Sequence, residues 1–339
     1  MQHQITNPGP LLNELGCLRE PGYAISPLLE YQRNKIAASV WRIKEWDYYA
    51  ILHHDYALTC TIADLGYSAM LSVVFLDFKT PKLKTAMKLL WFPFGKMQLP
   101  SSSTKGDVVY RNEDYTIEFF REPTHRKIHL HVAKFDGDDG LDAMIRLDSP
   151  NEDSMVIATP WKENAKAFYY NQKINCMPAS GSVTIGKNEF SFDKETSLGV
   201  LDWGRGVWTY KNTWYWSSLS GFADGKRIGF NLGYGFGDTS AATENMVFVD
   251  GKAIKLDQVT FEFDPSDLMK PWTFKDNEGK FEAVMKPVLI RRDHTNFVII
   301  KNLGSQVFGY FEGFIKVSSK QTIHFTDLIG FAEEITNHY

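Results

Sequence analysis

Short segments of alternating apolar and polar residues, each ended by glycine, asparagine, aspartate or proline, recur along this 339-residue chain. Residues 246–249 and 252–255, for example, flank Asp250-Gly251, a pair that favours the tight turn of a β-hairpin. The 3.6-residue period of a helix is confined to two short candidates, residues 27–36 and 81–90. The pattern predicts an all-β protein of antiparallel barrels or sandwiches with few short helices.

The length of the chain predicts two domains, because 339 residues exceed what one hydrophobic core usually organises. The weakest segment between strands is 175–182, which contains Pro178 and Gly181. We therefore expect an N-terminal β domain over residues 1–180 and a C-terminal β-barrel domain over residues 181–339.

Charge and hydropathy narrow the range of partners. The net charge is −4 and no basic block is present, so nucleic acid is not an expected partner. The most apolar stretch, residues 86–99, is interrupted by Lys88, Pro93 and Lys96, and is too short and too charged for an integral membrane segment. The oligomeric state has no sequence signature here.

The three cysteines are scattered and odd in number, which suits a reducing cytoplasm and predicts neither a disulfide framework nor a zinc site. The polar N-terminal segment lacks the pattern of a secretory signal. His129 and His131 share a strand face without an evident third ligand, so no metal site is predicted.

No motif for a flavin or a nicotinamide is found, and we predict no cofactor. We expect a cytoplasmic protein.

One segment combines a carboxylate, a guanidinium and tryptophans, namely Leu201-Asp202-Trp203-Gly204-Arg205-Gly206-Val207-Trp208. An acid buried against aromatic faces is favoured in its neutral form and can donate a proton at neutral pH. This pattern predicts Asp202 as a general acid, with Arg205 as its electrostatic partner or as a substrate clamp. The alternative is a structural Asp–Arg ion pair, or a turn capped by the aspartate.

Trp214 and Trp216 are two residues apart and share one face if their segment is a strand. Together with Trp203 and Trp208, they are candidates for the wall of a pocket that packs on a flat apolar or cationic molecule. The alternative is ordinary packing in the core or between domains.

Two further polar or aromatic candidates follow. Glu244 and Asn245 precede the strand at 246–249, where they are suited to orienting a substrate carbonyl or acting as a base, or to satisfying loop backbone. Tyr234 lies in Gly233-Tyr234-Gly235-Phe236-Gly237, which does not match a nucleotide-binding motif. Such alternation predicts a crowded bend where a ligand or an indole approaches the backbone.

Residues 42–49 carry charge on both faces of a predicted strand. Trp46 and Tyr48 share one face and are candidates for pocket lining. Glu45 and Asp47 share the other face roughly 6–7 Å apart, a spacing that overlaps that of glycosidase carboxylates. The alternative is that these charges form salt bridges between strands.

Near the end of the chain, Gln306, Glu312 and Glu333 occur in apolar surroundings. Glu312 alternates with aromatic residues and is expected to point into the same cavity. A buried carboxylate there would be paired, for example with Arg291, or would have an unusual pKa.

Taken together, these segments resemble a bacterial family known as a domain of unknown function, over nearly the whole chain. The likeness includes Asp64-Leu65-Gly66-Tyr67, the segment around Asp202, and Gly330-Phe331-Ala332-Glu333. Lipocalin-like relatives of that family include carotenoid hydratases, tocopherol cyclase and fungal pericyclases that form decalins. Carotenoid hydratases place Asp-His in the central motif, whereas Trp203 follows Asp202 here. The resemblance implies two tandem lipocalin-like barrels with an apolar pocket near the domain junction.

The leading functional hypothesis is a cofactor-independent isomerase, cyclase or hydratase that acts on a hydrophobic, unsaturated small molecule such as an isoprenoid, a polyketide or a lipid. Asp202 would be the acid, the tryptophans the cavity wall, and Arg205 and Glu244 the polar anchors. One alternative is a carrier of a lipid or hydrophobic metabolite. Another is a carbohydrate-active enzyme that uses Glu45 and Asp47.

Overall fold

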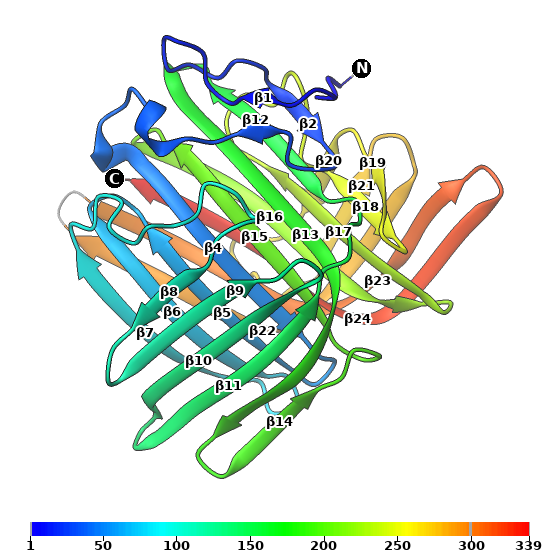
Figure 1. Ribbon diagram of the computed structural model, residues 1–339. Helices are drawn as coiled ribbons and strands as arrows, with labels where there is room; N and C mark the ends of the chain where they lie inside the picture. Colours follow the sequence, from blue (N-terminus) through cyan, green and yellow to red (C-terminus); the bar gives the residue numbers. More distant parts are fainter. Residues whose placement is uncertain (1, 298–299, 339) are drawn as a thin grey trace.

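The computed structural model describes residues 2–297 and 300–338 (Figure 1). Within these residues the chain forms 24 β-strands, two short 3₁₀ helices, η1 (Arg33–Lys35) and η2 (Val40–Arg42), and no α-helix. The all-β prediction is thus confirmed. The expected helix at 81–90 is wrong: this segment forms strand β7 (Lys82–Trp91), which pairs along its whole length with a neighbouring strand. Its residues are good helix formers, but pairing in the sheet overrides that local preference.

The first sheet has 13 strands. Its main path is β7, β6 (Ser68–Asp77), β5 (Tyr56–Asp64), β4 (Ile43–Leu52), β15 (Leu198–Val207), β13 (Asn164–Ile185), β11 (Asp139–Asp148), β10 (His125–Asp136), β9 (Tyr115–Arg121) and β8 (Val108–Arg111). Off this path, β13 also pairs with β12 (Met155–Trp161) and β14 (Asn188–Phe192), and β12 with β2 (Gly22–Ala24). A separate parallel pair joins β1 (Gly9–Pro10) and β3 (Leu29–Glu30).

The second sheet has nine strands. Its order is β19 (Lys252–Lys255), β18 (Met246–Val249), β17 (Lys226–Tyr234), β16 (Lys211–Ala223), β24 (Gln321–His338), β23 (Ile300–Ser318), β22 (Phe281–Phe297), β21 (Trp272–Asp276) and β20 (Val259–Glu262). The hairpin expected around Asp250-Gly251 is β18–β19.

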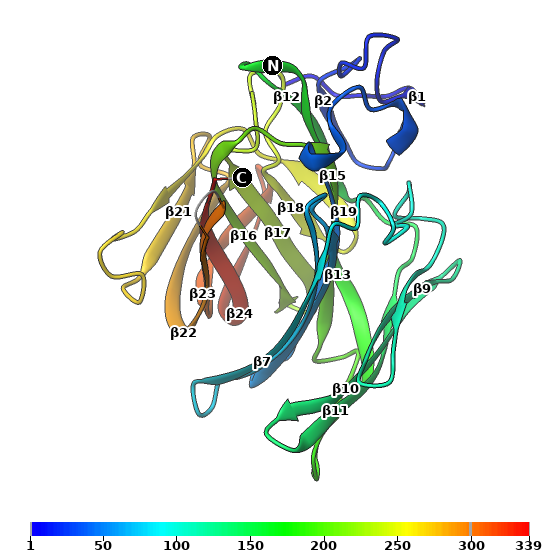
Figure 2. The same ribbon diagram turned by 90° about the vertical axis from the view of Figure 1, so that its left-hand side faces the viewer.

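Both large sheets are antiparallel and curl into half-barrels that lie against each other (Figure 2). This arrangement matches the two tandem lipocalin-like barrels that were expected. The chain passes from the first sheet to the second between β15 and β16. A domain division after residue 180 stays a prediction, and this position lies within β13.

An irregularity in β13 ties the two half-barrels together. The register of β13 against β15 shifts between Ile174 and Met177, and Cys176 adopts a left-handed φ of 60°. The bulge turns the Asn175 amide toward the second sheet, where it donates to Ser218 Oγ at 2.9 Å and to two backbone carbonyls. Bulges commonly redirect a side chain in this way.

The junction between the half-barrels is lined by one face of β4, β13 and β15. The even-numbered residues of β15 face the second sheet, and the odd-numbered residues face the interior of the first. Accordingly, Tyr48 of β4 packs on Trp216 and Phe331 of the second sheet, whereas Tyr49 packs on Phe119 of β9.

Candidate functional site

The alternation along β15 places the predicted site residues on two different faces. Arg205 and Trp203 point into the first half-barrel, where the guanidinium lies 4.3 Å from the centre of the indole. Arg205 Nη2 donates to Asp47 Oδ1 at 2.9 Å and to the carbonyl of Pro100 at 2.8 Å. The predicted pairing of Arg205 with Asp202 is therefore wrong, because residues three apart on a strand point in opposite directions.

Asp202 faces the second sheet and is paired with a lysine that sequence reasoning missed. Lys173 Nζ lies 2.7 Å from Asp202 Oδ2 and 3.9 Å from the centre of the Trp216 ring. Asn171 Nδ2 donates to Asp202 Oδ1 at 2.6 Å. All of these side chains are buried, and both contacts stabilise a negative charge on Asp202. The available signal was the presence of Asn171 and Lys173, two apart, within an aromatic strand.

Glu244 reaches the same region from the loop before β18. Asn231 Nδ2 lies 3.5 Å from Glu244 Oε2, and Asn231 Oδ1 accepts from Trp216 Nε1 at 2.7 Å, so Glu244 is linked to the indole. Burial raises the pKa of Glu244 to about 7; the nearby positive charge of Lys173 only partly offsets this effect. Gly233 leaves the room that the Glu244 carboxylate occupies, since a Cβ there would collide with it.

Glu333 supplies a second buried carboxylate, from β24. It accepts from Trp214 Nε1 at 3.0 Å and from Gln306 Nε2 at 3.3 Å, and the Gln306 amide also lies 3.3 Å from the Tyr48 hydroxyl. Burial raises the pKa of Glu333 to about 7. The expectation that a buried carboxylate near the end of the chain has an unusual pKa is thus met at Glu333.

Glu312 does not join this cluster. Its side chain is 46% exposed and its carboxylate lies 2.9 Å from Lys286 Nζ on the outside of the sheet. The alternation itself holds, because β23 pairs with β22 without a shift from Ile315 to Gly309, but the face that Glu312 shares with Tyr310 and Phe314 is only half-buried.

Aromatic rings close the junction beside the polar cluster. Tyr169 stacks on Phe236 at 4.7 Å between ring centres, and Trp208 meets Trp214 edge-on at 4.9 Å. Trp46 lies across Gly204, where any Cβ would collide with the indole, and stacks on Tyr169 at 6.2 Å. The structure therefore brings together four of the predicted binding residues, which are Trp46, Tyr48, Trp214 and Trp216. Sequence reasoning missed Tyr169 and Phe236.

Four buried polar atoms on the walls of this junction have no hydrogen-bond partner within the protein. Two are donors, the hydroxyl of Tyr169 and Nε1 of Trp208. Two are acceptors, Oδ1 of Asn171 and Oε1 of Glu244. Buried polar atoms are normally paired, because leaving one unpaired costs about 1–3 kcal/mol. Such a set, between aromatic walls, is typical of a place that receives a ligand or water.

A surface groove of about 340 Å³ borders this junction. Trp161 forms part of its lining and packs on Trp208 with ring centres 5.4 Å apart. The Trp161 indole therefore lies between the groove and Trp208, which belongs to the aromatic wall. Gly235 and Gly237, on either side of the buried Phe236, also line it.

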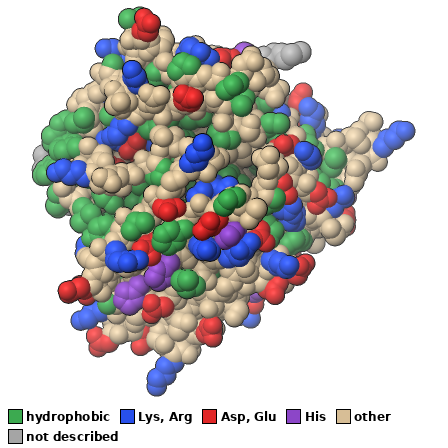
Figure 3. All heavy atoms as spheres, viewed as in Figure 1, with side chains coloured by type: hydrophobic (Ala, Val, Ile, Leu, Met, Phe, Trp, Pro, Cys, Tyr) green, Lys and Arg blue, Asp and Glu red, His purple; other side chains and the backbone are tan. Residues whose placement is uncertain are grey.

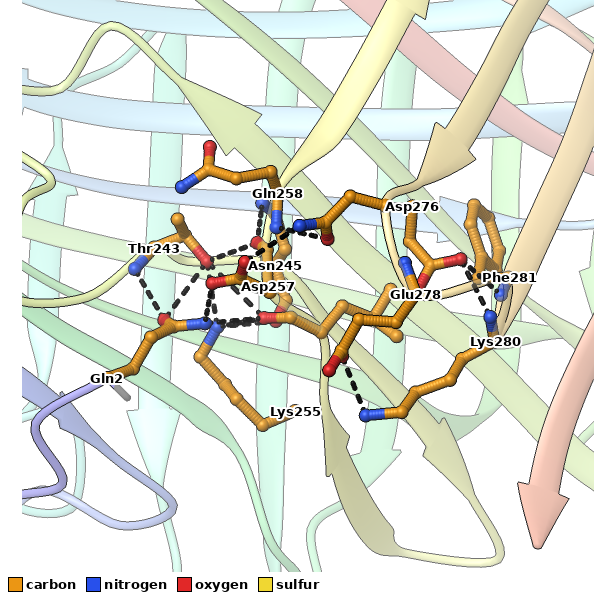
Figure 4. A network of polar contacts seen from close by, with 12 residues as sticks. Gln2, Thr243, Asn245, Lys255, Asp257, Gln258, Asp276, Glu278, Lys280 and Phe281 are labelled. Atoms are coloured by element: carbon orange, nitrogen blue, oxygen red, sulfur yellow. Dashed lines mark hydrogen bonds and ion pairs between the residues drawn. The ribbon is translucent and has the colours of Figure 1, made fainter. Parts of the chain in front are cut away.

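Besides Trp203 and Arg205, two further predicted site residues, Asn245 and Tyr234, lie outside the junction. Both polar atoms of the Asn245 side chain are hydrogen-bonded to backbone groups. Its Oδ1 accepts from Gly233 N and its Nδ2 donates to the carbonyl of Asp257, each at 2.9 Å. It belongs to a polar network with Gln2 and Lys255 that fixes the start of β18 (Figure 4). Tyr234 is 36% exposed and stacks on Tyr215.

Glu45 and Asp47 share a face as expected, but each has its own partner. Glu45 accepts from the hydroxyl of Tyr31 at 2.6 Å and is paired with Arg33, whereas Asp47 is paired with Arg205. This arrangement agrees with the salt-bridge interpretation of the segment.

The structure was searched for groups of metal-binding side chains and for helices that could span a membrane. His129 and His131 are hydrogen-bonded to Glu118 and Asp142, and in residues 2–297 and 300–338 no group of three or more His, Cys, Asp or Glu residues is placed to hold a metal ion. Over the same residues, none of the helices has the length and apolar character needed to cross a membrane.

Comparison with known proteins identifies the family. Residues 2–339 match the model of the family described as domain of unknown function DUF2804, and the chain belongs to this family. Among curated proteins, none matches the sequence significantly.

Solved structures share the fold at low identity. CghA, crystallised with Sch210972, is 13% identical, with a TM-score of 0.56 over 97% of each chain. A Nitrosomonas europaea protein provisionally named AttH is 14% identical, with a TM-score of 0.54 over 90% of this chain and 96% of that one. These likenesses confirm the two-barrel architecture.

Proposed function

We propose that the junction between the half-barrels catalyses an acid-initiated isomerisation, cyclisation or hydration of a hydrophobic, unsaturated small molecule, without a cofactor. The observation that carries this proposal is the buried Glu244 carboxyl, whose Oε1 has no hydrogen-bond partner and lies over Gly233, the cross-strand neighbour of Trp216. An isoprenoid, a polyketide or a lipid has the apolar surface that such walls bind.

Glu244 is the proton donor in this proposal. Its pKa of about 7 leaves a sizeable protonated fraction at neutral pH, which a general acid requires. Asp202 is instead engaged by Lys173 and Asn171, so its role is to hold Lys173 in place. This assignment revises the sequence hypothesis, in which Asp202 was the acid.

The proposed reaction begins when Glu244 transfers its proton to an alkene carbon or a carbonyl oxygen of the substrate. The resulting cation is stabilised by the faces of nearby rings such as Trp214 and Tyr169. Loss of a different proton to the Glu244 carboxylate completes an isomerisation or a cyclisation. Capture by water, whose proton returns to Glu244, completes a hydration.

The unpartnered donors and acceptors set the orientation of the substrate. The Tyr169 hydroxyl and Trp208 Nε1 are available to an acceptor on the substrate, and Asn171 Oδ1 to a donor. The presence of a named small molecule, Sch210972, in the crystal structure of CghA supports a small-molecule ligand for this fold.

The test starts with the compound that the protein itself retains. Native mass spectrometry of the purified protein, followed by extraction, would identify that compound; related unsaturated compounds would then be incubated with wild-type protein and with Glu244→Gln. We expect wild type to give a product of equal mass or with one water added, and Glu244→Gln to bind the compound but lose about 10²- to 10⁴-fold in rate.

The exposed Glu312 provides the matched control, and Glu312→Gln should keep full activity. Equal rates for wild type and Glu244→Gln would exclude Glu244 as the acid. A compound that is retained but never altered by wild type would indicate a carrier instead. The same four unpartnered atoms favour a carrier as the second candidate, since they would hold a polar end without any chemistry.

A further inference from the structure

An exposed apolar surface surrounds the outer end of β7, remote from the junction. Six large hydrophobic side chains there are each between 43% and 58% exposed: Trp41, Met87, Leu89, Trp91, Phe92 and Val109. We call them the β7 surface. A groove of about 380 Å³ continues it between Trp91 and Tyr110. Figure 3 shows hydrophobic side chains gathered at the left of the molecule, where β7 and the segment after it lie in Figure 1. Contiguous exposed apolar side chains usually mark an interaction site.

The backbone of the segment that carries Phe92 has an unusual conformation. Phe92 and Phe94 adopt left-handed backbone conformations, with φ of 57° and 47°, which bulky residues rarely tolerate. The fully buried Asp64 carboxylate holds the segment, because it accepts from the backbone N–H groups of Gly66 at 3.0 Å and Gly95 at 2.7 Å. Local strain is therefore maintained by a dedicated buried carboxylate, while Phe92 stays exposed to solvent.

The same part of the chain is basic. Between Asp77 and Asp107 the sequence contains six lysines and no acidic residue, although the whole chain has a net charge of −4. Lys79 and Lys84 are paired with acidic residues. Lys96 lines the groove, and Lys88, which points to the other face of β7 from Trp91, has its Nζ 5.9 Å from the centre of the Tyr110 ring in the same groove. Two positive charges thus border the groove that continues the β7 surface.

We propose that the β7 surface docks on an anionic lipid surface. Tryptophan and phenylalanine side chains insert at the boundary between headgroups and acyl chains, and lysines beside them are attracted to anionic headgroups. The positive charge selects this partner over a second copy of the chain, because a symmetric dimer through this face would place lysines against lysines. The proposal is independent of the chemistry at the junction.

The experiment is co-sedimentation of the full chain with vesicles of phosphatidylcholine alone, or of phosphatidylcholine mixed with phosphatidylglycerol. The variants are Trp91→Ser, Lys96→Gln and the pair Lys88→Gln with Lys96→Gln. Matched controls are Met144→Ser, which changes an exposed methionine on β11, and Lys187→Gln, which changes an exposed lysine in the β13–β14 turn.

We expect binding to the anionic vesicles that weakens with added salt, and little binding to phosphatidylcholine alone. Each lysine replaced beside the groove should weaken binding about fivefold, and Trp91→Ser should weaken it at least as much, whereas the controls should bind as wild type. Equal binding by all variants, or no binding to anionic vesicles, would overturn the proposal. So would a dimer in light scattering that Trp91→Ser converts to a monomer, because a second copy would then cover this face.

Discussion

Lys173 on β13 and Asp202 on β15 are direct cross-strand partners, and their Nζ and Oδ2 atoms lie 2.7 Å apart inside the junction between the half-barrels. A buried pair contributes little net stability compared with an apolar pair, but removing one partner leaves a buried charge without compensation. The pair also places an ammonium beside the Trp216 ring and within electrostatic range of Glu244 and Glu333. It therefore organises the charges around both carboxyls.

Replacing the lysine alone should destabilise the protein strongly. In Lys173→Met the Asp202 carboxylate stays buried without its cation, so the free energy of unfolding at neutral pH should fall by about 3–5 kcal/mol. In the double variant with Asp202→Asn, most of this loss should be recovered, because the unpaired charge is gone. Urea unfolding of the two single variants and the double variant measures the coupling. Simple additivity of the two single effects would show that the two side chains do not interact.

The raised pKa of Glu333 predicts a specific pH dependence. Its ordinary value is 4.5 and its folded value is about 7, so between these values the unfolded state releases the proton while the folded state keeps it. The free energy of unfolding should therefore fall as the pH rises from about 4.5 to about 7, by about 3 kcal/mol from this group, and then level off.

The matched variant for this prediction is Glu333→Gln, whose amide has no proton to lose in this range. The difference in unfolding free energy between Glu333→Gln and wild type should grow in favour of the variant as the pH rises toward 7. Urea midpoints measured across this range provide the test, and the difference cancels other titrating groups. A constant difference at every pH would contradict a raised pKa at Glu333.

The all-β class and the β18–β19 hairpin could be predicted from sequence because they depend on local alternation and turn residues. The helix expected at 81–90 could not be excluded in this way, since its residues suit a helix and only pairing with β6 makes them a strand. The aromatic wall could be predicted only in part, because some of its residues are brought together by packing between the two sheets. Trp214 and Trp216 are close in sequence, whereas Phe236 reaches Tyr169 only through the docking of the second sheet on the first.

The ion-pair partners of the buried charged residues could not be predicted from sequence neighbours alone. Asp202 and Arg205 are three residues apart and were predicted to pair, but the alternation of a strand places their side chains on opposite faces. Lys173 lies 29 residues before Asp202, on the neighbouring strand, and its spacing from Asn171 does not reveal which residue it faces, because that depends on the register between β13 and β15. Which carboxyl stays protonated depends on burial and on these distant partners, so Glu244 could be named as a candidate but not distinguished from Asp202.

Gly204 is expected to be intolerant of a side chain, because any Cβ would collide with the Trp46 indole that lies across it. Gly204→Ala should displace this ring, lower the free energy of unfolding by about 1–3 kcal/mol and change the intrinsic tryptophan fluorescence. Gly304→Ala is the matched control, since its new Cβ would come no closer than 3.4 Å to a neighbouring atom. Equal stability of the two variants would show that Trp46 is free to move.

The two faces of β15 predict that stability and catalysis can be separated by mutation. Arg205→Lys loses the paired contacts of the guanidinium with Asp47 and Pro100 inside the first half-barrel, and should lower the free energy of unfolding by about 1–3 kcal/mol. Because Arg205 faces away from the junction, the turnover of each folded molecule should stay within about twofold of wild type.

Glu244→Gln should show the opposite combination. Its turnover should fall by about 10²- to 10⁴-fold. Its unfolding free energy above pH 7 should equal or exceed that of wild type, because the amide avoids the cost of ionising a buried carboxyl whose pKa is raised to about 7. Urea unfolding and turnover measured on the same preparations distinguish the two variants. Loss of turnover in a fully folded Arg205→Lys protein would place the site in the interior of the first half-barrel instead of at the junction.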